Sequence, residues 1–269
     1  MSNLLKRTLT GVAIVTIVPG AVMLGVYGFM VLCLIINFFA LQEFYRLFQI
    51  NSNLVRKTLG IVLSVTLLIS TFCFVSQVAD WKVLLINLPL ISVIFITELY
   101  LKSDTPFSNL AFIFLGIIYI TLPVILLFSC GFGNTGYRPN VILGYFFLLW
   151  ANDTGAFVFG SLFGEYPLFR RISPKKTLEG SAGGAFLVVV IVFVNHAFFT
   201  EVSLLGWIII GLIVIVAGTF GDLVKSLMKR SLNVKDSGNM LPGHGGVLDR
   251  FDSLLGSVPI VFTYLALQL

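Results

Sequence analysis

Residues 208–221 read IIIGLIVIVAGTFG, an uncharged run that ends directly before Asp222. The rest of the chain resembles this run: it is 58% hydrophobic and only 11% charged, with a mean hydropathy of +1.02. A soluble domain is about 25% charged. Successive runs reach the roughly 20 apolar residues that span a hydrocarbon core. The sequence therefore predicts an all-α, polytopic bundle of transmembrane helices. Barrel strands would alternate apolar and polar residues instead.

About nine apolar runs mark the expected transmembrane helices. The first two could instead form one long kinked helix, because Pro19 and Gly20, and then Gly25 and Gly28, blur the division between them. The expected spans cover residues 8–25, 27–47, 57–78, 82–101, 107–130, 141–163, 178–199, 203–228 and 250–268.

The distribution of Lys and Arg orients these helices. If the N-terminus lies in the cytoplasm, all but two of the seventeen basic residues fall on inner segments, and only Lys82 and Arg138 lie outside. Cytoplasmic loops carry such an excess of positive charge. The sequence predicts a cytoplasmic N-terminus and an outer C-terminus. Lys6 and Arg7 precede the first run as in a signal peptide, but no cleavage motif closes it, so a retained helix is expected.

The two halves of the chain differ in charge. Residues 1–130 hold few charged side chains and are expected to form a scaffold for lipid contact and oligomerisation. Residues 141–269 hold eight of the twelve acidic residues and are expected to form the catalytic region, with its polar site facing the cytoplasm. The net charge of +5 is attributed to inner loops and a phosphate site rather than to nucleic-acid binding. Cys33, Cys73 and Cys130 lack any metal-binding spacing and are expected to be small buried hydrophobes.

A densely charged segment follows the apolar run and reads SLMKRSLNVKDSGNMLPGHGGVLDRFD, residues 226–252. Charges lodged between two membrane-length runs are energetically costly, which indicates a ligand that carries both phosphates and metal ions. Carboxylates would hold the cations, while Lys and Arg would hold phosphate oxygens. The residues concerned are Lys229, Arg230, Lys235, Asp236, His244, Asp249, Arg250 and Asp252.

Helical spacing gathers the first of these charges. Asp222, Lys225, Ser226, Lys229 and Arg230 recur at steps of three or four residues, so most share one helix face. A carboxylate near the end of a span faces a cavity or a partner rather than lipid. The alternative is a structural ion pair of Asp222 with Lys225 or Lys229.

Two carboxylates precede the last span. Asp249 and Asp252 are three residues apart, hence roughly on one helix face, and would repel unless a cation or an arginine lies between them. Hard oxygen ligands of this kind select Mg²⁺. The alternative for Asp249 is that it caps the helix.

Glycine clusters occur at two places. In PGHGG, residues 242–246, Gly245 and Gly246 would let backbone N–H groups approach a phosphate, and His244 would bind phosphate or order the loop. An ordinary connecting loop is the alternative. The second cluster favours close packing between helices and comprises Gly180, Gly183 and Gly184.

A further acidic residue, Asp153, lies well inside the run 141–163, and an intramembrane aspartate indicates a functional site by default. Pairing with a nearby basic residue is the alternative. The loop after this run suits phosphate binding at the membrane surface, or else contact with anionic lipid headgroups. Its two ammonium groups and two hydroxyls belong to Ser173, Lys175, Lys176 and Thr177.

The signatures of several other enzyme classes are absent from the sequence. It has no GxSxG, HExxH or Walker GxxxxGK[ST] pattern, and no nucleophile–base pair. The inventory of acidic and basic residues fits metal-assisted phosphoryl-type transfer, in which catalysis is mainly positioning and charge stabilisation.

The charged segment resembles the signature of the phosphatidate cytidylyltransferases, also called CDP-diacylglycerol synthases. Two earlier segments resemble that family as well, with Phe157 where Tyr is common, so that the resemblance covers about residues 150–253. The matching patterns are Ser226-x-Met228-Lys229-Arg230, Lys235-Asp236-x-Gly238, Leu241-Pro242-x-His244-Gly245-Gly246-x-x-Asp249-Arg250-x-Asp252, Asp153-Thr154-x-Ala156-Phe157 and Ser173-Pro174-Lys175-Lys176-Thr177-x-Glu179-Gly180.

The resemblance implies a reaction of CTP with phosphatidic acid that gives CDP-diacylglycerol and pyrophosphate. It also implies Mg²⁺, a monovalent cation such as K⁺, a homodimer and a place in the bacterial inner membrane. Asp222 and Asp249 match the family's metal-binding carboxylates, and Asp153, Asp236 and Asp252 are further candidates. Phosphate- and nucleotide-binding roles are expected for Ser173, Lys175, Lys176, Thr177, Lys225, Ser226, Lys229, Arg230, Lys235, His244, Gly245, Gly246 and Arg250.

Two rival functions remain open from the sequence. A CTP-dependent kinase of long-chain alcohols would release CDP rather than pyrophosphate. A cation-coupled transporter would use Asp153, Asp222 and Asp249 as an ion site, but it predicts midplane acidic residues and inverted repeats. The charges of this chain crowd the expected cytoplasmic side instead.

Overall fold

The structure, a computed structural model, describes residues 3–50, 53–133, 136–234, 237–238 and 245–268. The chain forms two compact units, each built from two separate segments. Unit 1 comprises Met1–Phe132 and Asp236–Arg250, and unit 2 comprises Gly133–Lys235 and Phe251–Leu269. This division differs from the one expected from the sequence, because residues 236–250 group with the N-terminal helices.

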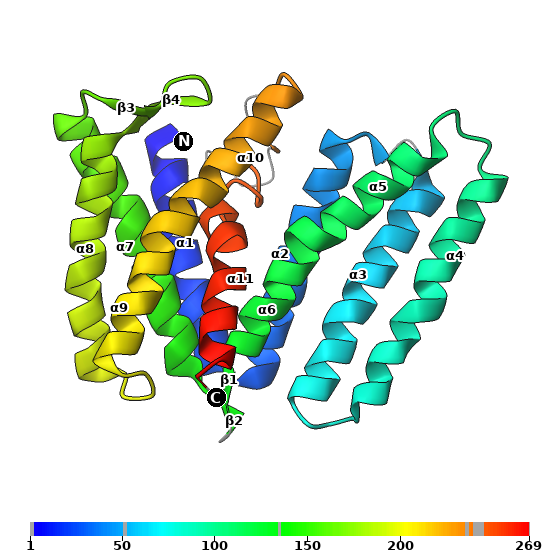
Figure 1. The fold of residues 1–269 in the computed structure, drawn as a ribbon, viewed down its shortest axis with the longest axis horizontal. Coiled ribbons are helices and arrows are strands. Elements are labelled where there is room, and N and C mark those ends of the chain that lie inside the picture. Colours follow the sequence, from blue (N-terminus) through cyan, green and yellow to red (C-terminus); the bar gives the residue numbers. More distant parts are fainter. Residues whose placement is uncertain (1–2, 51–52, 134–135, 235–236, 239–244, 269) are drawn as a thin grey trace. The chain divides into compact units, whose positions relative to one another are not determined.

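Unit 1 is helical (Figure 1). Gly25 has a φ of +92°, and the break there makes two helices of the first two runs rather than one kinked helix. A π-helical turn, η3, joins α5 to α6 without a gap. The elements are α1 (Asn3–Met23), α2 (Val26–Leu47), α3 (Leu54–Val75), the 3₁₀ helix η2 (Trp81–Ile86), α4 (Asn87–Tyr100), α5 (Pro106–Gly116), η3 (Ile117–Thr121) and α6 (Leu122–Cys130).

The core of unit 1 lies around α2, which packs against α3, α5 and α6. Its apolar side chains are supplemented by buried polar contacts. Asn37 Nδ2 donates to Ser64 Oγ over 2.6 Å, and Ser64 Oγ lies 2.9 Å from Thr121 Oγ1. Arg56 and Glu98 form a buried two-pronged ion pair between α3 and α4, with N–O distances of 2.5 and 3.1 Å.

Unit 2 contains the remaining helices and a small hairpin. The chain enters it through two short paired strands, β1 (Phe132–Gly133) and β2 (Gly136–Tyr137). Two small sheets are thus added to the expected all-helical fold. The other elements are α7 (Pro139–Phe163), the antiparallel strands β3 (Pro167–Phe169) and β4 (Ser173–Thr177), α8 (Leu178–Phe198), α9 (Leu204–Ile213), the π-helical turn η4 (Val214–Gly218), α10 (Thr219–Ser231) and α11 (Asp252–Ala266).

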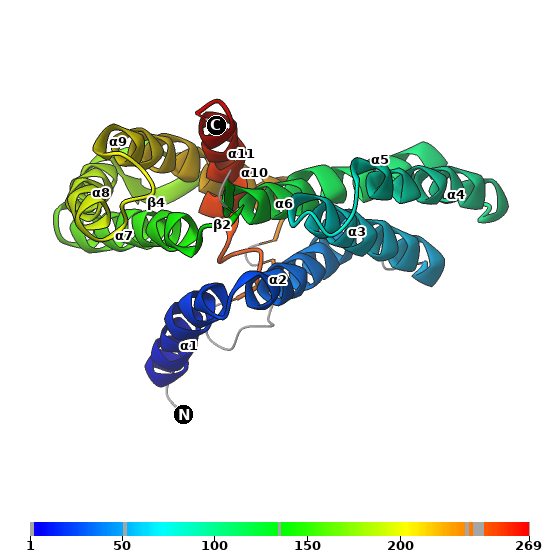
Figure 2. The ribbon, with the colours of Figure 1, turned by 90° about the horizontal axis from the view of Figure 1, so that it is seen from below.

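Glycines bring α7 and α8 close together, and the two helices run side by side (Figures 1 and 2). A β-carbon on Gly155 would lie 2.5 Å from the carbonyl oxygen of Gly183, and one on Gly184 would lie 2.8 Å from that of Asn152. The expected role of the second glycine cluster in helix packing is confirmed.

The expected membrane character is confirmed. Seven helices of the described chain are long and apolar enough to cross a membrane: Val26–Leu47, Leu54–Val75, Trp81–Tyr100, Pro106–Cys130, Pro139–Phe163, Leu178–Phe198 and Leu204–Ser231. Two shorter apolar helices, Thr10–Met23 and Asp252–Ala266, correspond to the first and last expected runs. The protein is an integral membrane protein, while the count of about nine spans and their orientation stay predictions. Cys33 and Cys130 are buried and all three cysteines are free thiols.

Candidate functional site

The first polar cluster of the site lies in unit 2 and is built around α10. This helix continues the apolar run of α9 and η4, and it carries Asp222 in its first turn. Lys225, one turn later, is buried with 4% exposure, and its ammonium nitrogen lies 3.4 Å from Asp222 Oδ1. The same ammonium forms an ion pair with the buried carboxylate of Asp252 at the start of α11. Lys225 therefore links two carboxylates from different helices, which offsets the cost of burying each charge.

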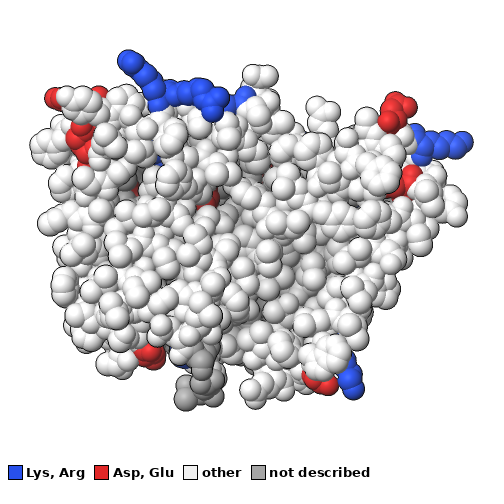
Figure 3. All heavy atoms as spheres, viewed as in Figure 1, with Lys and Arg blue, Asp and Glu red and all other residues white. Residues whose placement is uncertain are grey.

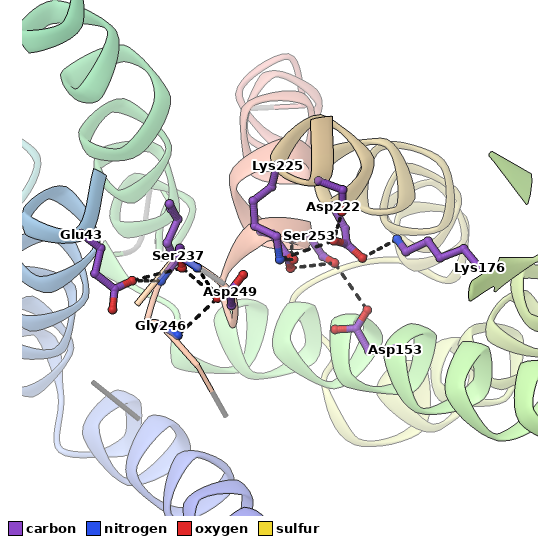
Figure 4. Close-up of polar contacts among 12 residues, drawn as sticks. Glu43, Asp153, Lys176, Asp222, Lys225, Ser237, Gly246, Asp249 and Ser253 are labelled. Atoms are coloured by element: carbon purple, nitrogen blue, oxygen red, sulfur yellow. Dashed lines mark hydrogen bonds and ion pairs between the residues drawn. The ribbon is translucent and has the colours of Figure 1, made fainter. Parts of the chain in front are cut away.

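The β3–β4 hairpin brings a second cation to Asp222. Lys176 on β4 forms an ion pair with the other oxygen, Asp222 Oδ2, so each carboxylate oxygen faces an ammonium group (Figure 4). Thr177 caps α8, because its Oγ1 accepts a hydrogen bond of 3.1 Å from Gly180 N. The Glu179 carboxylate accepts a hydrogen bond of 3.3 Å from the backbone N–H of Tyr166, directly before β3, and so ties the start of the hairpin to α8.

Basic side chains gather at this end of unit 2 (Figure 3). On the face that Figure 3 shows, the surface below them is mostly uncharged, as expected for a surface that faces lipid. Ser173 and Lys175 also lie on β4, so the four residues expected in a loop lie on one short strand.

Asp153 belongs to the same unit. It lies on α7, as expected, and its Oδ1 accepts a long hydrogen bond of 3.4 Å from Ser253 Oγ on α11. Ser253 follows Asp252 directly, and its backbone N donates to Asp252 Oδ1 over 2.7 Å. The three aspartates 153, 222 and 252 are thus tied to one set of side chains from α7, α10 and α11.

The cluster could bind a hard cation such as Mg²⁺, because its acceptors are carboxylate oxygens. The ammonium groups of Lys176 and Lys225 already form ion pairs with these carboxylates, which shows that positive charge is favoured there. Within the described ranges, however, no three His, Cys, Asp or Glu side chains come together as a ready-made metal site. Lys176 and Lys225 are the cations that balance the carboxylates here.

The second polar cluster lies in unit 1 and is built around Asp249. Its Oδ2 accepts three hydrogen bonds: from Ser237 N over 3.1 Å, from Ser237 Oγ over 2.8 Å and from Gly246 N over 3.2 Å (Figure 4). Three donors to one oxygen fix the orientation of the carboxylate. Gly245 has a φ of +86°, and a β-carbon on it would lie 3.1 Å from the Asp249 carboxylate. Backbone at this loop therefore lies close to a carboxylate of the chain itself, while the approach of Gly245 and Gly246 to a phosphate stays a prediction.

Sequence reasoning missed two residues of this cluster, Glu43 and Arg46, both on α2. The Glu43 carboxylate accepts from Val247 N and Leu248 N over 2.9 Å each, and Arg46 Nη2 donates to the Ser237 carbonyl oxygen over 3.1 Å. Glu43 could have been found from the sequence, because it is an acidic residue inside the apolar run 27–47. The same rule, that a charged residue within a span indicates a functional site, identified Asp153.

The relation expected between Asp249 and Asp252 is wrong. α11 begins only at Asp252, whereas Asp249 lies in the preceding turn and belongs to unit 1. The two carboxylates therefore do not share a helix face, and Asp249 does not cap α11, whose N-cap is Phe251.

The remaining predicted residues fall in three places. Ser226, Lys229 and Arg230 lie on α10, as expected, and Ser226 Oγ donates to Asp222 Oδ1 over 3.5 Å. Arg250 is exposed in the turn after Asp249. Lys235, Asp236 and His244 lie outside the described residues.

The sequence is similar to proteins of known activity. A model of the cytidylyltransferase family matches residues 5–268. Phosphatidate cytidylyltransferase of Staphylococcus aureus (strain COL) is 33% identical over 261 residues, which cover 95% of this chain and 96% of that protein. The proteins of the same name from Staphylococcus haemolyticus and Staphylococcus epidermidis are 33% and 30% identical, with the same coverage. The chain therefore belongs to the cytidylyltransferase family and is a CTP-using nucleotidyltransferase.

Proposed function

We propose that this enzyme is a phosphatidate cytidylyltransferase, which transfers CMP from CTP to phosphatidic acid and releases pyrophosphate. The observation that carries the proposal is the Asp222 carboxylate between Lys176 and Lys225, in the C-terminal part of the membrane-length helical segment Leu204–Ser231. Acidic and basic groups concentrated at such a position suit two polyanionic substrates, one of which is a lipid. The similarity to phosphatidate cytidylyltransferases over 95% of the chain supports the same substrates.

The reaction needs little proton chemistry from the protein. An oxygen of the lipid phosphate, already anionic at neutral pH, attacks the α-phosphorus of CTP. The new P–O bond forms as the bond to the bridging oxygen of the β-phosphate breaks, and that oxygen leaves with its electron pair in pyrophosphate. The protein must bring two anions together, position them and stabilise the departing charge.

Ammonium and guanidinium groups would supply most of this stabilisation. Lys176 on the hairpin and Lys229 and Arg230 on α10 would bind phosphate oxygens, with Lys175 and Arg250 as further contacts. Ser173, Thr177 and Ser226 would add hydroxyl donors. Buried Lys225 would hold Asp222 and Asp252 in place, because both carboxylates depend on its ammonium group.

Mg²⁺ fits the oxygen donors, and we assign Asp222 and Asp249 as carboxylates that would hold it, each within its own unit. Asp153 and Asp252 are further ligand candidates in unit 2. A bound Mg²⁺ would neutralise phosphate charge and polarise phosphoryl oxygens. Lys176 would then exchange its ion pair with Asp222 for a phosphate oxygen.

The same proposal includes the setting of the enzyme. The excess of basic residues on the expected inner segments supports a site that faces the cytoplasm, where CTP is available, in the inner membrane of a bacterium. A monovalent cation such as K⁺ and a homodimer complete the proposal as implications of the family resemblance.

The direct test is a two-product assay on detergent-purified protein supplied with CTP, Mg²⁺ and phosphatidic acid. We expect CDP-diacylglycerol and pyrophosphate in equal amounts, no reaction without Mg²⁺, and loss of activity by at least about 100-fold in Asp249→Asn. Asp104→Asn, the same change at an exposed position between α4 and α5, is the matched control and should retain activity. Release of CDP from CTP, with phosphorylation of a long-chain alcohol and no pyrophosphate, would replace this function by a lipid kinase.

A further inference from the structure

Glu43 is a buried carboxylate for which the proposed reaction has no direct use. It lies on α2, a helix of membrane-spanning length, and only 1% of it is exposed. Isolated charges at such positions are costly and are kept where they are bonded to something specific. The partners of Glu43 are backbone N–H groups more than two hundred residues further along the chain.

The bonds of Glu43 clamp the turn that carries Asp249. Val247 N donates to Oε1 and Leu248 N donates to Oε2, each over 2.9 Å, and Ser237 Oγ lies 3.5 Å from Oε2. The two carboxylate oxygens thus bind successive peptide groups, directly before Asp249. Because those N–H groups are buried, they would be left without an acceptor if the carboxylate were removed.

Ser237 connects the two carboxylates. Its hydroxyl lies 2.8 Å from Asp249 Oδ2 and 3.5 Å from Glu43 Oε2, while its backbone N also bonds Asp249. Arg46, one turn after Glu43, holds the carbonyl oxygen of the same serine over 3.1 Å. From a single helix, Glu43 and Arg46 therefore hold Ser237, which donates to Asp249, and Glu43 also holds the turn directly before Asp249.

Two glycines leave room for this clamp. A β-carbon on Gly238 would lie 2.5 Å from Glu43 Oε1 and 2.7 Å from Arg46 Nη2, and one on Gly246 would collide with the Glu43 carboxylate and with Ser237. A side chain at either position would therefore collide with the contacts to α2.

We propose that Glu43 is a positioning residue that holds Asp249 in the geometry needed to bind a divalent cation. This inference rests on the proposed metal-binding role of Asp249. It gives the N-terminal helices a part in catalysis, in addition to their expected part as a scaffold. Glu43 itself accepts hydrogen bonds from the protein and acts through Asp249.

The test measures metal binding without turnover. Mn²⁺ would be titrated into purified protein in detergent without CTP, and free Mn²⁺ would be followed by electron paramagnetic resonance. Glu43→Gln keeps the shape of the side chain but presents an N–H group to one of the two backbone donors. We expect it to weaken Mn²⁺ binding about tenfold, the usual effect of losing a supporting hydrogen bond behind a metal ligand.

Glu98→Gln is the matched control. Glu98 is also a buried carboxylate of unit 1, and both of its carboxylate oxygens accept from Arg56 on α3 rather than from the turn that carries Asp249. It should lower thermal stability without changing Mn²⁺ affinity. Arg46→Gln provides a milder second variant of the clamp, should Glu43→Gln fail to fold, and should weaken Mn²⁺ binding in the same direction.

A double mutant separates positioning from general damage. If Glu43 acts through Asp249, Glu43→Gln combined with Asp249→Asn should bind Mn²⁺ no more weakly than Asp249→Asn alone. In activity assays, excess Mg²⁺ should restore turnover to Glu43→Gln but not to Asp249→Asn. Parent-like Mn²⁺ affinity in folded Glu43→Gln and Arg46→Gln would overturn the inference while leaving the proposed function intact. Parent-like affinity in Asp249→Asn would instead remove the metal-binding role of Asp249, on which this inference rests.

Discussion

Lys225 neutralises two carboxylates of unit 2, those of Asp222 and Asp252. Its buried ammonium group pairs with Asp222 and with Asp252, and removing one partner of a buried ion pair commonly costs about 3–5 kcal/mol. We expect Lys225→Met to lower the free energy of unfolding in detergent by about 3 kcal/mol. Adding Asp252→Asn should recover part of the loss, because it removes the buried carboxylate that has lost its ammonium partner, whereas Asp222 keeps Lys176. Equal thermal stability of parent and Lys225→Met would contradict this account.

Lys176 is expected to exchange partners during the reaction. Its ion pair with Asp222 competes with a cation at that carboxylate, and its ammonium is needed by phosphate once CTP arrives. Lys176→Gln should therefore tighten Mn²⁺ binding in the absence of CTP and raise the KM for CTP by about tenfold. Arg171→Gln, a loss of charge in the same hairpin, controls for the general field. A Lys176→Gln variant that changes neither quantity would rule out the exchange.

For individual residues, the sequence predicts ion-pair partners that are close in the chain. It misses ion-pair and hydrogen-bond partners that are distant in the chain. The three-residue step from Asp222 to Lys225 fixes their contact, because both lie on one helix. Lys176 and Glu43 reach their partners only through tertiary packing. Glu43 contacts residues 247 and 248, which lie 204 and 205 residues further along the chain. No rule of local spacing predicts a contact at that distance.

At the scale of elements, apolar length predicted the helices well, and polar capping residues decided where they end. α3 begins three residues earlier than expected because Asn53 caps it, accepting from Val55 N and Arg56 N. Thr177 and Ser203 cap α8 and α9 in the same way. The β3–β4 hairpin was not predicted, since its basic residues carry none of the alternation by which strands are recognised.

Close packing of α7 and α8 positions Asp153 and the hairpin, and it can be tested with a single methyl group. Gly184→Ala would place a β-carbon 2.8 Å from the Asn152 carbonyl oxygen, in backbone that cannot move aside cheaply. We expect a loss of about 1–3 kcal/mol in unfolding free energy. Gly20→Ala in α1 meets no atom within 4 Å and should leave stability unchanged or raise it by up to about 1 kcal/mol. Comparable melting temperatures for both variants would show that the contact between α7 and α8 accommodates a methyl group without loss of stability.

At the scale of the whole molecule, the chain order does not match the division into units. After α10 the chain passes from unit 2 to unit 1, where Val247 and Leu248 bind Glu43 on α2, and it then returns to unit 2 as α11. The difference in charge between the two halves of the sequence could not predict this division. A charge count compares continuous segments, whereas each unit is built from two separate segments. Asp249 and Asp252, three residues apart, consequently belong to different units.

The orientation of the chain in the membrane gives the last prediction. Asp80 and Asp104 are exposed and lie just beyond opposite ends of the helical segment Trp81–Tyr100, which is long enough to cross. The distribution of basic residues places the first outside and the second in the cytoplasm. With the three native cysteines replaced, a membrane-impermeant thiol reagent should label Asp80→Cys in intact cells and Asp104→Cys only after permeabilisation. Reversed labelling would invert the orientation and separate the charged end of unit 2 from cytoplasmic CTP, whereas equal labelling would mean that this segment does not cross the membrane.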